Sequence, residues 1–199
     1  NVLRETPGCI TPPLESEMAK PKPLMTKSSG PDDGAVQSAL RTLDAEASGV
    51  AALSAALKSD LGTAFVAAAD LIRKAKGRLI VTGLGKSGHI GRKIAATFAS
   101  TGTPAFFVHT AEASHGDLGM ITADDAIMAL SWSGEQPEMR NLIAYAARFG
   151  IPLIAMTADK DSTLSKAADV QLTLPKAREA CPHNLAPTTS TLMQAAIGD

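Results

Sequence analysis

Apolar residues recur at alternating spacings of four and three along residues 35–57, the pattern of one face of an amphipathic α-helix. A second helix is predicted at 61–76, where apolar residues again share one face and Gly77 closes the end. Because an apolar stripe needs a partner, both helices are expected to pack against other parts of the molecule.

Beyond Gly77, short apolar segments alternate with helical ones. The predicted strands are residues 79–82, 105–108, 126–131, 152–156 and 170–174. Strands that are apolar throughout are expected where helices cover both faces of a sheet, and right-handed crossovers make such a sheet parallel. The pattern therefore predicts an α/β fold, a three-layer αβα sandwich. Ligands of such sheets bind at the carboxyl ends of the strands, so we expect functional residues in the loops that follow them.

Residues 1–33 have a different composition, with six prolines and few large apolar side chains. Such a segment buries too little apolar surface to offset the entropy lost on ordering. We predict a disordered or extended tail over residues 1–33 and one domain over residues 34–199. The sequence stops at Asp199 within a helix-like stretch, so we expect it to be a piece of a longer protein.

Composition excludes several classes of function. Of 199 residues, 45% are hydrophobic, which is enough for one sizeable core. Lys and Arg number 19 against 20 acidic residues, which argues against a nucleic-acid partner. Cys9 and Cys181 lie far apart, which argues against a disulfide framework and a structural zinc site. No apolar run reaches the roughly 20 residues that a bilayer requires, so we expect a soluble cytoplasmic protein without a membrane partner.

Residues 83–88 (Gly-Leu-Gly-Lys-Ser-Gly) join the first strand to a helix. Glycines allow a tight turn, and the helix start offers free N–H groups and a positive dipole end to an anion. A Walker phosphate loop is excluded because Ile80 stands where its first glycine belongs. A dinucleotide loop fits the glycines, but the second strand ends at His109 without a ribose-binding acid. The Lys and Ser favour a compact phosphorylated or acidic ligand, and a turn that only packs helix on strand stays open.

The third strand is followed by residues 131–138 (Ser-Trp-Ser-Gly-Glu-Gln-Pro-Glu), which lead into a helix. Ser133 is expected to cap that helix, and a capped helix start with hydroxyl groups is again suited to a phosphate. Glu135 and Glu138 stand one turn apart, either as solvated charges or with one carboxylate aimed into the ligand crevice.

Other loops add further candidates. His115 follows the second strand between glycine and acidic residues, where a histidine is well placed to titrate. Glu179 lies in the segment after the fifth strand. Four consecutive hydroxyl residues, 188–191, open the last predicted helix and offer a third contact for a phosphate or sugar.

Several of these motifs together resemble one family, the arabinose-5-phosphate isomerases of the sugar isomerase domain fold. The similar segments follow one another in the family's order: residues 85–93, 101–104, 115–119, 179–182 and 186–188. The likeness covers roughly residues 40–199 and is more specific than the glycine turn alone. It implies a five-stranded, flavodoxin-like parallel sandwich.

The resemblance implies interconversion of D-ribulose 5-phosphate and D-arabinose 5-phosphate through an enediol, with no cofactor and no metal. The product would feed synthesis of the eight-carbon acidic sugar of lipopolysaccharide or capsule. The resemblance also implies a homotetramer with sites at subunit interfaces. A further histidine and paired nucleotide-sensing modules are expected beyond Asp199.

By the same resemblance, four residues are expected to be catalytic: Lys86, His115, Glu138 and Glu179. Contacts to phosphate or sugar are implied at Gly85, Ser87, Gly88, Ser131, Ser133, Gly134, Glu135, Thr188, Thr189 and Ser190. Residues 132–136 depart from the family, which more often has Asn and a second Ser there.

Moving a proton beside a carbonyl requires a base that reaches both carbons and a group that stabilises the enediolate. We expect Glu138 to be the base, with Glu179 as the alternative. Lys86 is expected to stabilise the oxyanion or orient hydroxyls, and His115 to open the sugar ring or relay a proton.

Two other functions stay open. The same fold could act on another phosphosugar, such as a phosphoheptose or an aminosugar phosphate. The chain could also be a sugar-phosphate sensor joined to a DNA-binding domain, but its neutral charge balance and the lack of a basic helix-turn-helix upstream speak against this.

Overall fold

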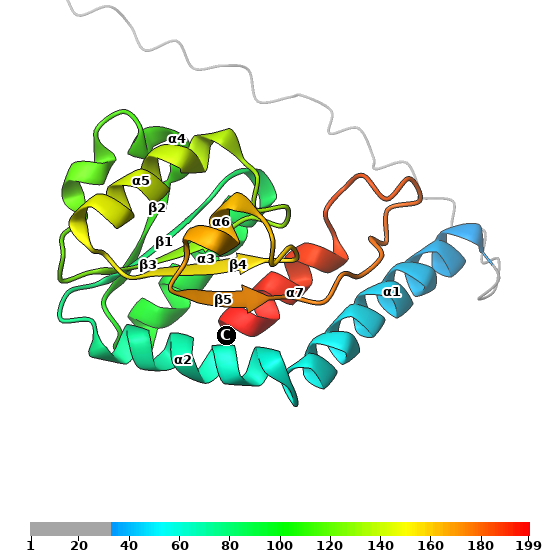
Figure 1. Ribbon diagram of the computed structural model, residues 1–199. Helices are drawn as coiled ribbons and strands as arrows, with labels where there is room; N and C mark the ends of the chain where they lie inside the picture. The colour runs from blue at the N-terminus through cyan, green and yellow to red at the C-terminus, as the bar shows by residue number, and fades with distance from the viewer. Residues whose placement is uncertain (1–32) are drawn as a thin grey trace, which may run out of the picture.

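The computed structural model describes residues 33–199 (Figure 1). The predicted tail therefore lies outside the described residues, except for Asp33. The Asp33 side chain accepts a hydrogen bond from the Ala35 N–H at 3.3 Å and so caps the first helix.

The two predicted N-terminal helices are confirmed as α1 (Gly34–Ala56) and α2 (Asp60–Lys74). Gly77 does not end α2 as expected. A Cβ atom at Gly77 would lie 2.4 Å from Asp125 Oδ1, so glycine is needed there for the close approach of two chain segments. Among residues 33–199, no single helix is both long and apolar enough to cross a bilayer, and α1 with α2 would meet that test only as a pair bent by 79°.

All five predicted strands are present and parallel, and their bounds agree with the prediction to within about a residue. They are β1 (Leu79–Gly83), β2 (Ala105–His109), β3 (Ala126–Leu130), β4 (Leu153–Thr157) and β5 (Val170–Thr173). The strand order is β2-β1-β3-β4-β5, which is the flavodoxin-like order. Every residue of β1, β3 and β4 is buried, which explains why these strands are apolar throughout.

Seven more helical segments follow or connect the strands. They are α3 (Gly85–Ser100), α4 (Thr110–Ala113), η1 (Asp117–Met120), η2 (Pro137–Met139), α5 (Arg140–Phe149), α6 (Thr163–Ala167) and α7 (Thr189–Gly198), where η marks a 3₁₀ helix. The short α4, η1 and α6 were not predicted. Figure 1 shows the resulting layers, with α2, α3 and α7 on one face of the sheet and α4, α5 and α6 on the other.

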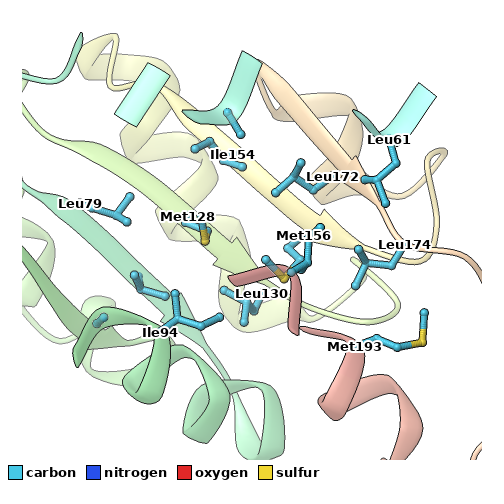
Figure 2. Packing of buried hydrophobic residues seen from close by; sticks show 14 of the residues in the cluster. Leu61, Leu79, Ile94, Met128, Leu130, Ile154, Met156, Leu172, Leu174 and Met193 are labelled. Atoms are coloured by element: carbon cyan, nitrogen blue, oxygen red, sulfur yellow. The ribbon is translucent and has the colours of Figure 1, made fainter. Parts of the chain in front are cut away.

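Two apolar clusters hold these layers together, one on each face of the sheet. On the first face, Ile94 of α3 and Met193 of α7 pack against strand residues such as Met156 (Figure 2). On the second face, Leu142 of α5 and Leu164 of α6 cover the alternate strand residues. The sequence expectation of a three-layer αβα sandwich is therefore confirmed.

A buried carboxylate joins the amino ends of the strands. The Asp125 side chain is only 1% exposed and accepts hydrogen bonds from the backbone and guanidinium of Arg78 and from the backbone and hydroxyl of Thr122. Burial raises the pKa of Asp125, but the hydrogen bonds from Arg78 and Thr122 outweigh burial, so this pKa lies below the ordinary aspartate value.

Candidate functional site

The chain reverses its direction of travel across the sheet between β1 and β3. From β1 it continues through α3 on one face to β2, and from β3 it continues through α5 on the other face to β4. The carboxyl ends of β1 and β3 lie side by side, because Gly83 at the end of β1 is paired with Leu130 at the end of β3. Loops that diverge at such a switch point leave a crevice between them, which is the usual ligand position in open α/β sheets.

In the glycine turn after β1, two glycines are needed for close packing of α3 on β1, whereas a third lies in open space at the start of α3. A Cβ atom at Gly88 would lie 2.8 Å from Gly83 O, so these two glycines allow α3 to approach β1. This confirms the packing interpretation for Gly83 and Gly88. Gly85 differs, because its φ of +56° favours glycine while no atom lies within 4 Å of a Cβ there.

The start of α3 is available to a ligand. Its N-cap residue, Leu84, makes no side-chain hydrogen bond to the first turn. Lys86 is exposed and Ser87 is half-buried within that first turn. The first turn of this 16-residue helix thus carries backbone N–H groups, a lysine and a serine, a combination that suits an anion.

The loop after β3 is ordered by its own polar groups. Ser131 is fully buried, and its Oγ accepts a hydrogen bond from the Gly134 N–H at 3.0 Å. Gly134 has a φ of +69°, and its carbonyl accepts a hydrogen bond from the Leu164 N–H at 3.1 Å. Ser133 is exposed and does not cap the following helix as expected, since the chain becomes helical only at Pro137. Its hydroxyl instead accepts a hydrogen bond from the Glu135 N–H at 3.4 Å, within the exposed loop after β3.

Glu135 has a structural partner on the next element. Its carboxylate accepts hydrogen bonds from the Thr163 backbone N–H at 2.6 Å and from the Thr163 hydroxyl at 2.8 Å. These two bonds hold the pKa of Glu135 below the ordinary glutamate value. The carboxylate is thus engaged with the first residue of α6, and the sugar contact expected of Glu135 would have to compete with these bonds.

The segment after β2 carries His115 toward the loop after β3. The His109 ring accepts a hydrogen bond from the Ala111 N–H at 3.3 Å and so caps α4, a role that sequence reasoning missed. His115 lies exposed in the turn beyond α4. The Asn141 side chain donates a hydrogen bond to Ser114 Oγ at 3.0 Å, which ties this turn to the start of α5.

Glu138 lies in η2, next to this junction. Elements η2 and α4 are in contact, so Glu138 and His115 belong to neighbouring segments of the rim. Glu138 is exposed, and its carboxylate makes no hydrogen bond or ion pair within residues 33–199. In this respect it differs from Glu135 and Glu179, whose carboxylates are both engaged.

Glu179 and Thr188 bind each other. Glu179 Oε2 accepts hydrogen bonds from the Thr188 N–H at 2.7 Å, the Thr188 hydroxyl at 3.0 Å and the Ser190 N–H at 3.2 Å. Burial raises the pKa of Glu179, but the hydrogen bonds from Ser190 and Thr188 outweigh it, so this pKa lies below the ordinary glutamate value. In the same loop, the backbone N–H groups of residues 186 and 185 lower the pKa of the Cys181 thiol.

The first turns of α7 contain two fully buried polar residues: Thr189, which was expected to contact the phosphate or sugar, and Gln194, which sequence reasoning missed. Thr189 and Gln194 are fully buried, and neither the Thr189 hydroxyl nor the Gln194 amide group has a hydrogen-bond partner within residues 33–199. A polar residue on the buried stripe of an otherwise apolar helix was the signal in the sequence for Gln194.

The polar groups described above lie at the carboxyl ends of the strands. A cavity of about 570 Å³ lies elsewhere, at the amino ends, where α2, α3 and the last residues of α7 meet. Among residues 33–199, no three His, Cys, Asp or Glu side chains are grouped closely enough to hold a metal ion.

Comparison with known proteins agrees with this geometry. Residues 71–199 match the SIS domain. The chain is 52% identical over 164 residues to the arabinose 5-phosphate isomerase KdsD of Pseudomonas aeruginosa, an alignment that covers 82% of this chain and 49% of that protein. It is 56% identical over 130 residues to the arabinose 5-phosphate isomerase KpsF of Escherichia coli O6:H1, covering 65% of this chain and 40% of that protein. The chain thus spans half or less of the length of these relatives.

A solved structure shows the same architecture. It is an Escherichia coli CFT073 protein in complex with arabinose 5-phosphate, and it superposes with a TM-score of 0.76 at 36% identity. The superposition covers 83% of this chain and 86% of that one.

Proposed function

This chain belongs to the SIS domain family, and we propose that it is the isomerase domain of an arabinose 5-phosphate isomerase. The reaction is the interconversion of D-ribulose 5-phosphate and D-arabinose 5-phosphate through an enediol. The product supplies the eight-carbon acidic sugar of lipopolysaccharide or capsule. Two relatives that carry this name are 52% and 56% identical to the chain, and both support the proposal.

One observation carries the proposal: the open start of α3 lies beside the loop after β3 at the switch point of the sheet. There, first-turn N–H groups and Ser87 are available to a phosphate, and the Ser133 hydroxyl lies on the neighbouring loop. In the proposed site, residues 85–88, 131–135 and 188–190 surround the phosphosugar.

In the proposed reaction, Glu138 removes the proton beside the carbonyl and returns it one carbon away. Its carboxylate is exposed and makes no hydrogen bond or ion pair within residues 33–199, so it can turn toward either carbon. Lys86 stabilises the enediolate oxygen, and His115 opens the sugar ring or relays a proton. The reaction moves a proton without net oxidation, so the proposal includes no cofactor and no metal.

The test is a coupled assay of ribulose 5-phosphate conversion by the natural full-length protein and its Glu138→Gln variant. Removing a general base lowers turnover by about 100-fold to 10,000-fold. The matched control is Glu112→Gln, which neutralises another exposed carboxylate on the adjacent α4 and should keep parental turnover. Near-parental turnover of Glu138→Gln would show that Glu138 is not the base.

The same assay separates the alternatives. An isomerase for another phosphosugar would convert a phosphoheptose or an aminosugar phosphate faster than ribulose 5-phosphate. A sensor would bind the phosphosugar without converting it.

We also propose that the protein is a cytoplasmic homotetramer with active sites at subunit interfaces, and that it binds neither nucleic acid nor membrane. The exposed stripe of α1 supports association, because Leu43 is 59% exposed, Leu40 47% and Val36 42%. Sedimentation of the full-length protein as a monomer would contradict the tetramer.

A further inference from the structure

The segment between β5 and α7 is a long connection without regular structure. Figure 1 shows it projecting past the carboxyl ends of β4 and β5 before it returns to the start of α7. Connections of this length are uncommon inside a compact domain, and ordered ones are often functional. This segment leads directly into residues 188–190 of the proposed site, so the groups that fix its shape bear on that site.

Hydrogen bonds between residues 179–180 and residue 188 close this segment into a loop. The Ala180 N–H donates to Thr188 Oγ1 at 2.9 Å, while the Thr188 hydroxyl and N–H both donate to Glu179 Oε2. Within the loop, the Glu179 N–H donates to Asn184 Oδ1 at 3.0 Å. Asn184 itself adopts a φ of +54°, which asparagine tolerates better than most residues.

The same carboxylate also caps the last helix. The Ser190 N–H lies in the first turn of α7 and donates to Glu179 Oε2 at 3.2 Å. Thr188, which precedes the helix, provides no side-chain cap of its own. A negative charge at a helix start is stabilising, so one oxygen of Glu179 satisfies two backbone N–H groups and one hydroxyl.

This arrangement leaves Glu179 poorly suited to accept the substrate proton. Oε2 already accepts three hydrogen bonds, and the bonds that hold it lower the basicity of the whole carboxylate. The one hydroxyl hydrogen of Thr188 is also committed to Glu179, so it is not available to a phosphate.

We propose that Glu179 is a positioning residue of the site: its carboxylate fastens loop 179–188 to the start of α7 and thereby sets where Thr189 and Ser190 lie. This inference rests on the proposed function for its effect on substrate, but the fastening itself is independent of any activity. Glu138 is then the base, and Glu179 binds no substrate proton.

The experiment compares Glu179→Gln with Glu179→Ala in the natural full-length protein. Glutamine keeps a carbonyl oxygen that can accept the hydrogen bonds from Thr188 and Ser190, but it cannot act as a base. We expect Glu179→Gln to keep kcat within about tenfold of the parent, with a raised KM and an unchanged acidic limb in the pH profile of kcat/KM. Glu179→Ala should raise KM further, and kcat should fall because the start of α7 is released.

Two outcomes would overturn the proposal. One is a loss of about 100-fold or more in kcat for Glu179→Gln, the loss expected of a general base. The other outcome is measured by hydrogen exchange, which reports directly on the hydrogen bonds between Glu179 and the start of α7. The amides of Thr188 and Ser190 should exchange about tenfold faster or more in Glu179→Ala and stay protected in Glu179→Gln. Unchanged protection in Glu179→Ala would refute the fastening.

A second pair of variants tests the same bond from its other end. Thr188→Val removes the hydroxyl that joins Glu179 to Ala180 and should raise KM. Thr188→Ser keeps the hydroxyl, so its KM should stay near that of the parent. If the unsubstituted protein converts no phosphosugar, the proposed function fails, and hydrogen exchange still decides whether Glu179 fastens the loop.

Discussion

Neutralising Asp125 should destabilise the protein without touching the proposed site. Asp125 lies at the amino ends of the strands, where one carboxylate receives five hydrogen bonds from Arg78 and Thr122. In Asp125→Asn only one oxygen remains as an acceptor, and the new amide group faces donors. Breaking a buried ion pair costs about 3–5 kcal/mol. Because the Arg78 side chain is 42% exposed and keeps part of its hydration, we expect the lower end, about 3 kcal/mol.

The measurement is urea unfolding followed by circular dichroism, with Asp124→Asn as control because Asp124 is an exposed neighbour. A loss of about 3 kcal/mol corresponds to a Tm lower by roughly 6–12 °C for a domain of this size. The pKa of Asp125 is depressed in the fold, so its contribution is complete above the unfolded-state pKa of about 3.9 and is lost as pH falls through the folded value. The difference between parent and Asp125→Asn should therefore be largest near neutral pH and shrink below about pH 4.

Either of two results would refute this reasoning. A loss below about 1 kcal/mol at neutral pH would mean that the charge of Asp125 contributes no more than an ordinary hydrogen bond. A difference between parent and Asp125→Asn that stays constant down to about pH 3 would mean that its ionisation is not linked to folding.

Two glycine substitutions test close contacts near the proposed site, with Gly119→Ala as control because no atom lies within 4 Å of a Cβ there. Gly134→Ala should lower stability by about 2 kcal/mol or more and weaken substrate binding, since φ is +69° and the new Cβ would lie 2.1 Å from Ser162 Oγ. Parental thermal unfolding would contradict this. Gly49→Ala should cost about 1–3 kcal/mol despite the better helix propensity of alanine, because its Cβ would lie 2.4 Å from Thr189 Cγ2 and push α1 away from α7. A stabilised variant would show that α1 adjusts freely.

The sheet and the long helices could be predicted from the sequence because burial on both faces leaves uniformly apolar strands between turn residues. The short α6 could not, because it contains one turn and a half and depends on partners elsewhere. Its start is held by the Ser162 hydroxyl, which accepts a hydrogen bond from the Ser165 N–H, and by Glu135, 28 residues earlier in the chain than its partner Thr163. No periodicity in the sequence encodes such a contact.

The sequence predicted which loops carry the polar residues of the candidate site, but not which contacts those residues make. Lys86 and Ser87 occupy the first turn of α3 as expected, because glycines and a strand end are local signals. Ser133 does not cap a helix, since the left-handed Gly134 turns the chain and delays the helix until Pro137. The partners of Glu179 could not be predicted, because Thr188 and Ser190 are 9 and 11 residues away in the sequence and meet Glu179 only in the folded loop.

The Asp125 cluster and the proposed pocket lie at opposite ends of strands that are five residues long, or about 16 Å. Energetic effects of substitutions usually become independent beyond about 7–10 Å. The hydrogen bonds that stabilise the fold around Asp125 and the residues proposed to bind the sugar thus lie at opposite ends of the same sheet. Substitutions in the proposed pocket should therefore leave the hydrogen bonds of Asp125, at the opposite rim, intact.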